Sequence, residues 1–290
     1  MFDKVTIIGI GMIGSSVALS LRDNKLAKEV VIYDHNHDYL IEAESLRLGN
    51  VYEKDLEKSV VNSDVVIICT PVKTFYEITK VICPVMKKGA ILTDVGSVKD
   101  EVIKQVLPNL HDGICFVPAH PVAGSEKSGP SAGFKEVFHG RWNIITPFDK
   151  ATKESILKIR KMWEAFGMKV EEMTPLHHDR NMAIVSHLPH MLAYNMVFTA
   201  SKLEDEFESE IIKYSAGGFR DSTRMAGSSP EMWRDIFLTN SKALFEIMES
   251  YINNLRYMQK LIEDKEADKL YDLFSETKEI RNQVIACKQN

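Results

Sequence analysis

A glycine motif set between a strand pattern and a helix pattern constrains this chain more than any other feature. GIGMIG, Gly9–Gly14, follows the β-branched run VTIIGI and opens the helical pattern SSVALSLRDN. The next strand pattern, VVIYD, ends at Asp34, close to the spacing of about 20 residues typical of the acidic residue in a dinucleotide-binding unit. The stretch therefore predicts a βαβ unit that holds a dinucleotide. A glycine turn without a ligand is the alternative.

Each position of the motif has a physical role. Gly9 permits a tight turn, Gly11 lets the backbone approach a pyrophosphate, and Gly14 lets the helix pack closely on the strand. The helix N-terminus offers unpaired N–H groups and the positive end of its dipole to the phosphates. We expect Met12 and Ile13, inside the motif, to contact the same ligand.

Asp34 predicts which dinucleotide is bound. Its carboxylate can accept hydrogen bonds from a ribose diol and would repel a 2′-phosphate, so it favours NAD over NADP. The segment after the strand pattern VVIIC reaches the same edge of the sheet, where ligands bind in open α/β folds. We expect the cofactor to be contacted there by Thr70, Pro71 and Val72.

Alternation between short β-branched runs and helical patterns continues through the first half of the chain. The runs are VTIIGI, VVIYD, VVIICT, AILTDV and ICFVPA. They predict an α/β, Rossmann-type, doubly wound parallel sheet. We expect two further runs, NIITP and MKVEEM, on either side of a helix at Thr152–Phe166, to extend that sheet.

The character of the sequence changes near residues 172–176. From Pro175 onward the chain shows long helical patterns and no strand pattern, which predicts a dinucleotide-binding domain at 1–173 and an all-helical domain at 174–290. Long helices rich in apolar side chains often bury a face against a second subunit, so we expect a dimerisation domain and a homodimer. A self-contained helical bundle is the alternative.

Composition argues against several classes of partner. The net charge of −5 shows no basic bias toward nucleic acid, and no apolar run approaches the roughly 20 residues that span a membrane. The N-terminus lacks a basic region and a cleavage site, so no secretory signal is expected. The scattered cysteines favour reduced thiols in a cytoplasmic protein over disulfides or a zinc site. They are Cys69, Cys83, Cys115 and Cys287.

Two candidate catalytic side chains follow strand patterns. Ser97, in DVGSVK, is placed to meet the nicotinamide or the substrate; a cap on a helix that starts at Val98 is the alternative, and both roles can hold together. His120 opens the polar loop HPVAGSEKSG, and Pro121 biases it toward an extended backbone. An imidazole beside a nicotinamide can accept the hydroxyl proton of an alcohol that loses a hydride. A surface-loop histidine is the alternative for His120.

The helical half supplies groups that suit carboxylates. Arg220 and Arg224 are four residues apart in GGFRDSTRMAG, and a planar guanidinium can bind both oxygens of a carboxylate. Arg220 is the weaker candidate, with a solvated helix charge as its expected role. Asp221 is a further candidate for the substrate site, because it can orient the local backbone or a neighbouring cation. Trp233 either lies near a ligand or belongs to the core.

Four histidines in the same half raise the question of a metal. His187 and His190 share a helix face, but no HExxH pattern and no nearby cysteine accompany them, so a metal site is not expected. A place at a buried helix N-terminus or at an interface is the alternative for these two and for His177 and His178. Pro189 should kink its helix, because an interior proline removes a backbone hydrogen bond.

The chain resembles the prephenate dehydrogenase family over nearly its whole length. Five stretches carry the resemblance: GIGMIGSSVA, DVGSVK, HPVAGSEKSG, SHLPH and DSTRMAGSSPEMW. The first is common to many dehydrogenases, and the third together with the fifth is specific. The resemblance implies a Rossmann-type domain followed by an all-helical dimerisation domain, in a monofunctional protein of tyrosine biosynthesis. It also implies NAD-dependent oxidative decarboxylation of prephenate to 4-hydroxyphenylpyruvate, CO2 and NADH.

The resemblance further implies roles for individual residues. His120 would hydrogen-bond the ring hydroxyl of the substrate, Ser97 would share that contact, and Arg224 would bind the substrate. The other residues that it places at the substrate pocket are Ser125, Glu126, His187, His190 and Trp233.

Three alternatives stay open. Arogenate dehydrogenases act on the amino analogue of prephenate. β-Hydroxyacid dehydrogenases use a catalytic lysine in the helical domain, and the HPVAG histidine disfavours that class. The non-enzyme alternative is a dinucleotide-sensing module without catalysis, which the joint presence of Ser97, His120 and Arg224 disfavours.

Overall fold

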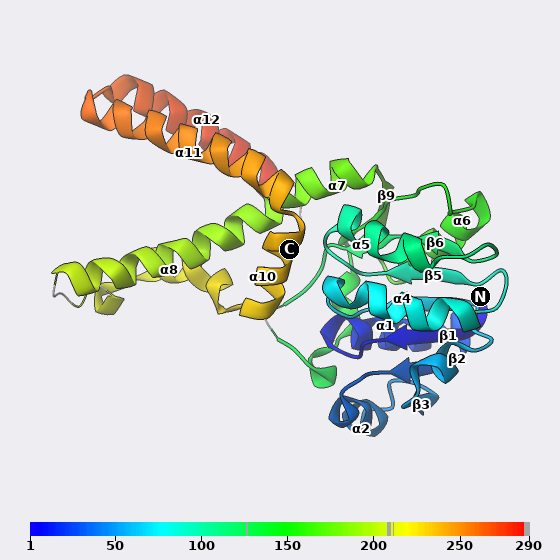
Figure 1. Cartoon of the computed structure of the whole chain (residues 1–290). Helices are drawn as coiled ribbons and strands as arrows, with labels where there is room; N and C mark the ends of the chain where they lie inside the picture. The colour runs from blue at the N-terminus through cyan, green and yellow to red at the C-terminus, as the bar shows by residue number, and fades with distance from the viewer. Residues whose placement is uncertain (126, 208–209, 211, 287–290) are drawn as a thin grey trace. The chain divides into compact units, whose positions relative to one another are not determined.

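The computed structural model describes residues 1–125, 127–207, 210 and 212–286. The chain forms two compact units, Met1–Asn240 and a second one that begins at Ser241 (Figure 1). In the part of the chain so described, every helix is too short or too polar to cross a membrane.

Six parallel strands form the central sheet of the first unit. Their order is β3-β2-β1-β4-β5-β6, so the strand order reverses between β1 and β4. This is the doubly wound, Rossmann-type arrangement predicted from the alternating patterns. The strands are β1 Phe2–Ile8, β2 Ala27–Tyr33, β3 Val51–Glu53, β4 Val65–Ile68, β5 Ile91–Asp94 and β6 Cys115–Val117.

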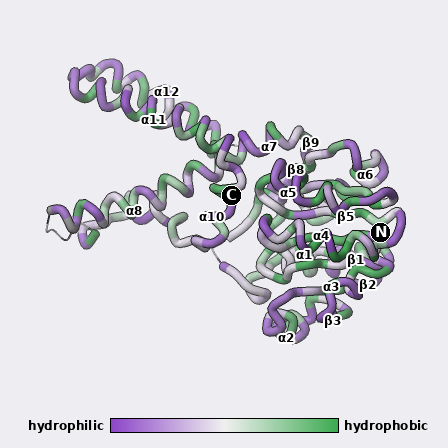
Figure 2. Tube along the Cα trace, in the orientation of Figure 1, coloured by the Kyte–Doolittle hydropathy of each residue, from purple (hydrophilic) through white to green (hydrophobic). Residues whose placement is uncertain are grey.

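Helices cover both faces of this sheet, and each face has its own apolar core. Val65 and Ile67 of β4 pack in one core with α1, α2 and α6, whereas Val66 and Ile68 pack in the other with α3, α4 and α5. Figure 2 shows hydrophobic residues gathered around strands such as β1. The helices are α1 Met12–Asp23, α2 His37–Ser45, α3 Leu56–Val60, α4 Phe75–Ile82, α5 Lys99–Val106 and α6 Lys153–Ala165.

The later strands do not extend the central sheet, and that expectation is wrong. They form a separate sheet of order β7-β8-β9, in which β7 is antiparallel to β8. Pro118 divides the run ICFVPA between β6 and β7, because it has no N–H to continue a strand ladder. His120 therefore lies within β7, opposite Ile144. The strands are β7 Ala119–Pro121, β8 Trp142–Ile145 and β9 Lys169–Glu172.

The polar loop after β7 crosses the start of α1. A Cβ on Gly124 would lie 3.7 Å from Cε of Met12, and the N–H of Phe134 donates to Oγ of Ser16 at 3.1 Å. The loop is therefore held beside the helix that follows the glycine motif.

Beyond β9 the described residues form helices and the loops between them. Two long helical patterns are each divided: a π-helical turn stands directly before the helix that contains Pro189, and Asn240 separates α10 from α11. Pro189 lacks the N–H that a regular helix would use at this point, so the expected disturbance takes the form of a π turn. The helical elements after β9 that belong to the first unit are α7 Pro175–Met182, the π turn η6 Ala183–His187, α8 Leu188–Phe207, η7 Ile212–Tyr214, α9 Gly217–Thr223, η8 Arg224–Gly227 and α10 Pro230–Thr239. Those of the second are α11 Ser241–Glu263 and α12 Ala267–Ala286, where hydrophobic and hydrophilic residues alternate (Figure 2).

The contact between α1 and the glycine turn predicts a difference between two glycines. A Cβ on Gly14 would lie 2.0 Å from the carbonyl oxygen of Gly9, whereas one on Gly11 would meet nothing within 4 Å. Gly14→Ala should lower the free energy of unfolding by about 1–3 kcal/mol through overpacking. Gly11→Ala should change it by less than about 1 kcal/mol, because the gain from a stiffer unfolded chain is opposed by the poorer N-cap. Urea denaturation of both variants measures this, and equal unfolding free energies would contradict the close contact.

Candidate active site

The glycine motif forms the turn from β1 into α1. Gly9 has a φ of 94°, in the left-handed region, and Thr70 lies beside it at the end of β4. Gly11 is the N-cap of α1 and has no side chain to cap the helix, so the amides of the first turn can receive an anion. The open space at Gly11 and the tight contact at Gly14 agree with the roles expected of them. This turn fits the pyrophosphate of a dinucleotide.

Asp34 has a structural role that the sequence does not reveal. It is buried; its Oδ2 accepts the N–H of Ile10 and its Oδ1 accepts the N–H of Asn36, both at 2.8 Å. Asp34 thereby fixes the glycine turn to the end of β2. Each carboxylate oxygen can accept a second hydrogen bond, so its predicted contact with a ribose is compatible with this role.

A fully buried ion pair stands where the two sheets meet. Asp94 ends β5, Lys99 begins α5, and their side chains are in direct contact. Lys99 Nζ also donates to the carbonyl oxygen of Ala119 at 2.6 Å, and the N–H of Ala119 donates to Asp94 at 3.1 Å. Burial raises the pKa of Asp94 and lowers that of Lys99, and their attraction opposes both shifts. The pair fixes the backbone directly before His120.

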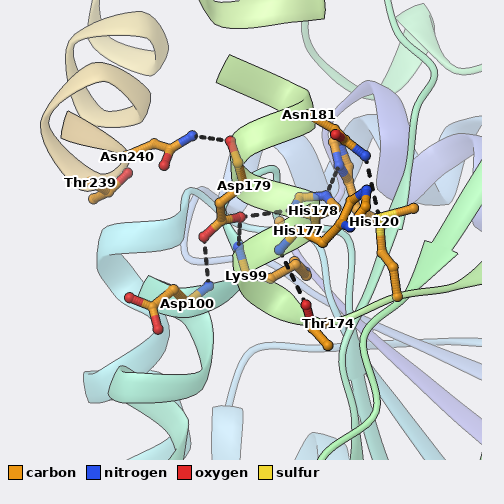
Figure 3. A network of polar contacts seen from close by, with 12 residues as sticks. Lys99, Asp100, His120, Thr174, His177, His178, Asp179, Asn181, Thr239 and Asn240 are labelled. Atoms are coloured by element: carbon orange, nitrogen blue, oxygen red, sulfur yellow. Dashed lines mark hydrogen bonds and ion pairs between the residues drawn. The ribbon is translucent and has the colours of Figure 1, made fainter. Parts of the chain in front are cut away.

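The ring of His120 is held by α7. Its Nδ1 lies 2.8 Å from Nε2 of His178, and Nδ1 of His178 lies 2.7 Å from Oδ1 of Asp179 (Figure 3). Asp179 also accepts the N–H groups of Lys99 and Asp100 at 2.8 and 2.9 Å, at the start of α5. His178 and Asp179 are buried, whereas His120 is partly exposed.

This environment keeps the two histidines neutral. Burial lowers the pKa of His120 well below its usual value, and the neighbouring His178, Lys99 and His187 lower it further. Burial also lowers the pKa of His178 to about 2, with Lys99 as the next cause. A neutral imidazole can accept a proton, so His120 is available as a base over a wide pH range.

His187 and Asn240 extend the network toward α8 and α10. The side-chain nitrogen of Asn240 donates to Nδ1 of His187 at 3.0 Å and to the carbonyl oxygen of Asp179 at 2.8 Å. Both residues are buried. The break in the long helical pattern at Asn240 thus places its amide between α7 and the π turn.

Trp233 joins the helical elements to the segment that carries Ser97. It is buried, it stacks on His190 with ring centroids 3.6 Å apart, and it packs against Val98, the residue after Ser97. Burial lowers the pKa of the partly exposed His190, and the charge of Arg224 lowers it further. Arg224 is exposed at the start of η8. Ser97, Trp233, His190 and Arg224 therefore belong to one neighbourhood.

Ser97 does not cap α5, so that alternative is wrong. The helix begins at Lys99 with Val98 at the N-cap, and the side chain of Val98 offers no acceptor. Asp179, from α7, supplies the acceptors for the first turn instead. Ser97 is partly exposed, and its contact with a ligand stays a prediction.

The remaining predicted residues receive less support from the geometry. Ser125 is exposed and its Oγ accepts the N–H of Lys127 at 3.3 Å. Glu126 lies outside the described residues. Asp221 and Arg220 are exposed on α9. Pro71 is exposed and Val72 is buried at the end of β4.

Neither a metal cluster nor a disulfide is found among the described residues. Within them, no three His, Cys, Asp or Glu side chains are grouped to hold a metal ion. Cys69, Cys83 and Cys115 are free thiols, and burial raises the pKa of Cys83 to about 11. Cys287 lies outside the described residues.

Five residues of this site were not predicted from the sequence as parts of it: Asp94, Lys99, His178, Asp179 and Asn240. Asp94 and Lys99 do stand in the quoted motif DVGSVK, where an aspartate at the end of an apolar strand pattern, five residues before a lysine, could have indicated a buried ion pair. For His178 the sequence predicted no metal site and left a place at a buried helix N-terminus or at an interface as the alternative. The carboxylate directly after it was the available signal for a hydrogen-bonded pair.

Similarity to known proteins extends over nearly the whole chain. The model of the prephenate dehydrogenase nucleotide-binding domain matches residues 17–172, and that of the prephenate dehydrogenase dimerization domain matches residues 174–276. The chain is 37% identical to the cyclohexadienyl dehydrogenase of Zymomonas mobilis, over 97% of this chain and 96% of that protein. It is 31% identical to the prephenate dehydrogenase of Bacillus subtilis, over 97% of this chain and 76% of that protein.

A solved structure is similar over the same extent. The prephenate dehydrogenase of Aquifex aeolicus, in complex with hydroxyphenyl propionate and NAD+, matches with a TM-score of 0.92 and 33% identity. The match covers 98% of this chain and 99% of that chain.

The buried histidines should make the protein less stable in acid. Burial lowers the pKa of His187 from 6.5 to about 4, so between these values the unfolded chain takes up a proton that the folded chain does not. The contribution of His187 to the free energy of unfolding is fully present above pH 6.5. It falls as the pH falls toward 4, by up to about 1.4 kcal/mol per pH unit. His187→Gln should therefore flatten the fall.

Urea denaturation at several pH values from neutrality to about pH 4 measures that slope. His177→Gln, which removes an exposed histidine of the neighbouring helix α7, is the matched control and should keep the wild-type slope. An equal slope in wild type and His187→Gln would show that His187 is not held neutral.

Proposed function

Since the chain belongs to the prephenate dehydrogenase family, we propose that it catalyses the NAD-dependent oxidative decarboxylation of prephenate to 4-hydroxyphenylpyruvate, CO2 and NADH. The observation that carries the proposal is His120, a partly exposed histidine whose ring is hydrogen-bonded through Nδ1 and held neutral. His120 lies on β7, which leads into the loop beside α1. A dinucleotide held at the start of α1 would react with its substrate near this loop, and the reaction requires a base there.

The chemistry assigns a proton step to His120. Prephenate has a cyclohexadienol ring with a carboxylate opposite the hydroxyl. Transfer of the C4 hydrogen as a hydride and loss of the ring carboxylate as CO2 leave an aromatic ring, while His120 accepts the hydroxyl proton and returns it to the phenolate oxygen. When bound, the nicotinamide supplies the hydride acceptor.

The residues of the glycine turn fit NAD. The amides at the start of α1, with Met12 and Ile13, would hold the pyrophosphate, and the buried Asp34 would hold the adenosine ribose through its remaining acceptor sites. Thr70, next to Gly9, adjoins the same turn.

Substrate binding is proposed for the neighbourhood of Trp233. His190 is the better candidate of the SHLPH pair, because it is partly exposed and close to Arg224, whereas His187 is buried and bonded to Asn240. Arg224 would bind a substrate carboxylate, and Ser97 would share the hydroxyl contact with His120. Ser125, Glu126 and Asp221 are proposed to lie around the same pocket.

Arogenate is the second candidate substrate. The name of the relative from Zymomonas mobilis specifies a cyclohexadienyl ring, which prephenate and arogenate share. The test mixes the purified protein with each substrate and with NAD or NADP, and follows the absorbance of the reduced nicotinamide. NADH formed from prephenate supports the proposal; none from either substrate would favour a dinucleotide-sensing module.

A homodimer is proposed as the working form. Residues 174–276 match a dimerization domain, and α8 exposes Met196, Val197 and Phe198 in succession. Sedimentation at micromolar concentration tests this, and a fully active monomer would refute it.

His120→Asn should lower kcat by roughly 10²–10⁴-fold, because asparagine cannot accept the proton. The wild-type rate should fall only well below pH 6.5, since burial lowers the pKa of His120 and protonation of the ring abolishes the base. That acid limb should be absent in the variant. Steady-state kinetics across pH measure both effects, with His177→Gln as a control that keeps the wild-type profile. A wild-type kcat in His120→Asn would exclude His120 as the base.

Asp34→Ser should raise the KM for NAD and weaken the preference against NADP. It removes a charged acceptor from the ribose and frees the amide of Ile10, at a cost of about 1.5–3 kcal/mol. The measurement is kcat/KM with each cofactor in wild type and variant. If the wild type uses NADP as readily as NAD, this interpretation of Asp34 is wrong.

A further inference from the structure

Asp179, His178 and His120 form a single line of hydrogen bonds, from α7 to β7 (Figure 3). Each link joins one nitrogen or oxygen to one nitrogen, at 2.7 and 2.8 Å. A neutral imidazole has one N–H and one lone pair, so a fixed acceptor at one end of such a line decides the direction of every hydrogen bond in it.

The carboxylate of Asp179 sets the direction. Its two oxygens accept the N–H groups of Lys99 and Asp100, at the positive N-terminal end of α5. Burial raises the pKa of Asp179, while these two amides and the charge of Lys99 lower it. With these two backbone N–H groups donating to it, Asp179 serves as an acceptor, and Nδ1 of His178 must be the donor in the third contact.

The tautomer of His120 follows. Because the proton of His178 is on Nδ1, its Nε2 carries a lone pair and accepts the Nδ1–H of His120. We propose that His178 and Asp179 are positioning residues that fix His120 in the tautomer whose Nε2 is free to act as the base. The proposal rests on the proposed function only in taking the substrate hydroxyl as the source of the proton.

The intervening imidazole also suits the charge of the site. Lys99 and His187 are the other titratable groups that face His120, and Lys99 is compensated by Asp94. A carboxylate in direct contact would favour the protonated ring strongly, whereas Asp179 acts at the distance of one more ring. When His120 takes the substrate proton on Nε2, its Nδ1–H stays donated to Nε2 of His178, which remains neutral.

The tautomers can be measured without substrate. Nitrogen-15 NMR of the ring nitrogens distinguishes N–H from lone-pair nitrogen, and the spectra of His120→Asn and His178→Asn assign two of the nine histidines by the signals that disappear. The expected wild-type result is a proton on Nδ1 and a lone pair on Nε2 for both His120 and His178. A proton on Nε2 of His120 would overturn the proposal.

Kinetics of two His178 variants supply the matched test. In His178→Gln the side-chain carbonyl can accept the Nδ1–H of His120, whereas the shorter side chain of His178→Asn can reach Asp179 but not His120. His178→Asn should lower kcat by about 10- to 100-fold with KM near the wild-type value, and His178→Gln should recover most of that loss. His177→Gln should behave as wild type.

Equal kcat values in His178→Asn and wild type would refute the positioning role. An equal loss in His178→Gln and His178→Asn, with the wild-type ring nitrogens in the opposite arrangement, would do so as well. If the wild type reduces NAD with neither prephenate nor arogenate, the proposed function fails, but the ring nitrogens of His120 and His178 still decide the tautomers.

Discussion

The buried ion pair between Asp94 and Lys99 is the interaction on which the rest of the site depends. It connects the end of β5, the start of α5 and the backbone of Ala119, so it joins the two sheets at the point where His120 emerges. Two charges removed from water are costly, and loss of one partner from such a pair typically costs about 3–5 kcal/mol. The extra hydrogen bonds to Ala119 satisfy groups that the pair alone would leave unsatisfied. The catalytic candidate thus stands on a polar core, whereas both faces of the sheet beneath are apolar.

The same lysine has an electrostatic effect on the histidines above it. Lys99 lowers the pKa of both His120 and His178, in addition to the larger effect of burial. A base must be unprotonated before the substrate arrives, and a positive charge held nearby disfavours early protonation. Asp179 acts through His178: it accepts the Nδ1–H of that ring, which leaves Nε2 of His178 as an acceptor for His120. The Asp94–Lys99 pair and the hydrogen bonds from Asp179 to His120 therefore serve the same purpose, which is to hold His120 in place and unprotonated until the substrate binds.

Features encoded by neighbouring residues could be predicted from the sequence. The glycine turn follows from Gly9, Gly11 and Gly14, and α6 begins where Thr152 and Ser155 cap each other. Features that depend on distant partners could not. Nothing near Lys99 in the sequence indicates that its amide bonds to a carboxylate 80 residues away. The second sheet was missed for a local reason, because the apolar run ICFVPA hid the effect of Pro118 on the ladder.

The π turn at Ala183–His187 has a consequence for how this part of the chain can vary in length. An α-helix turns by about 100° per residue, so one additional residue in a turn rotates everything after it by that angle relative to everything before it. The residues before the turn, His178 and Asp179, contact β7 and α5. His187, at the end of the turn, contacts Asn240, and His190, after it, stacks on Trp233. A regular helix through the same segment would turn one of these groups away from its partners. The number of residues between His178 and His190 sets this helical phase and is therefore a constraint of the fold in its own right: a single insertion or deletion would turn the residues that hold His120 away from those that pack near Trp233.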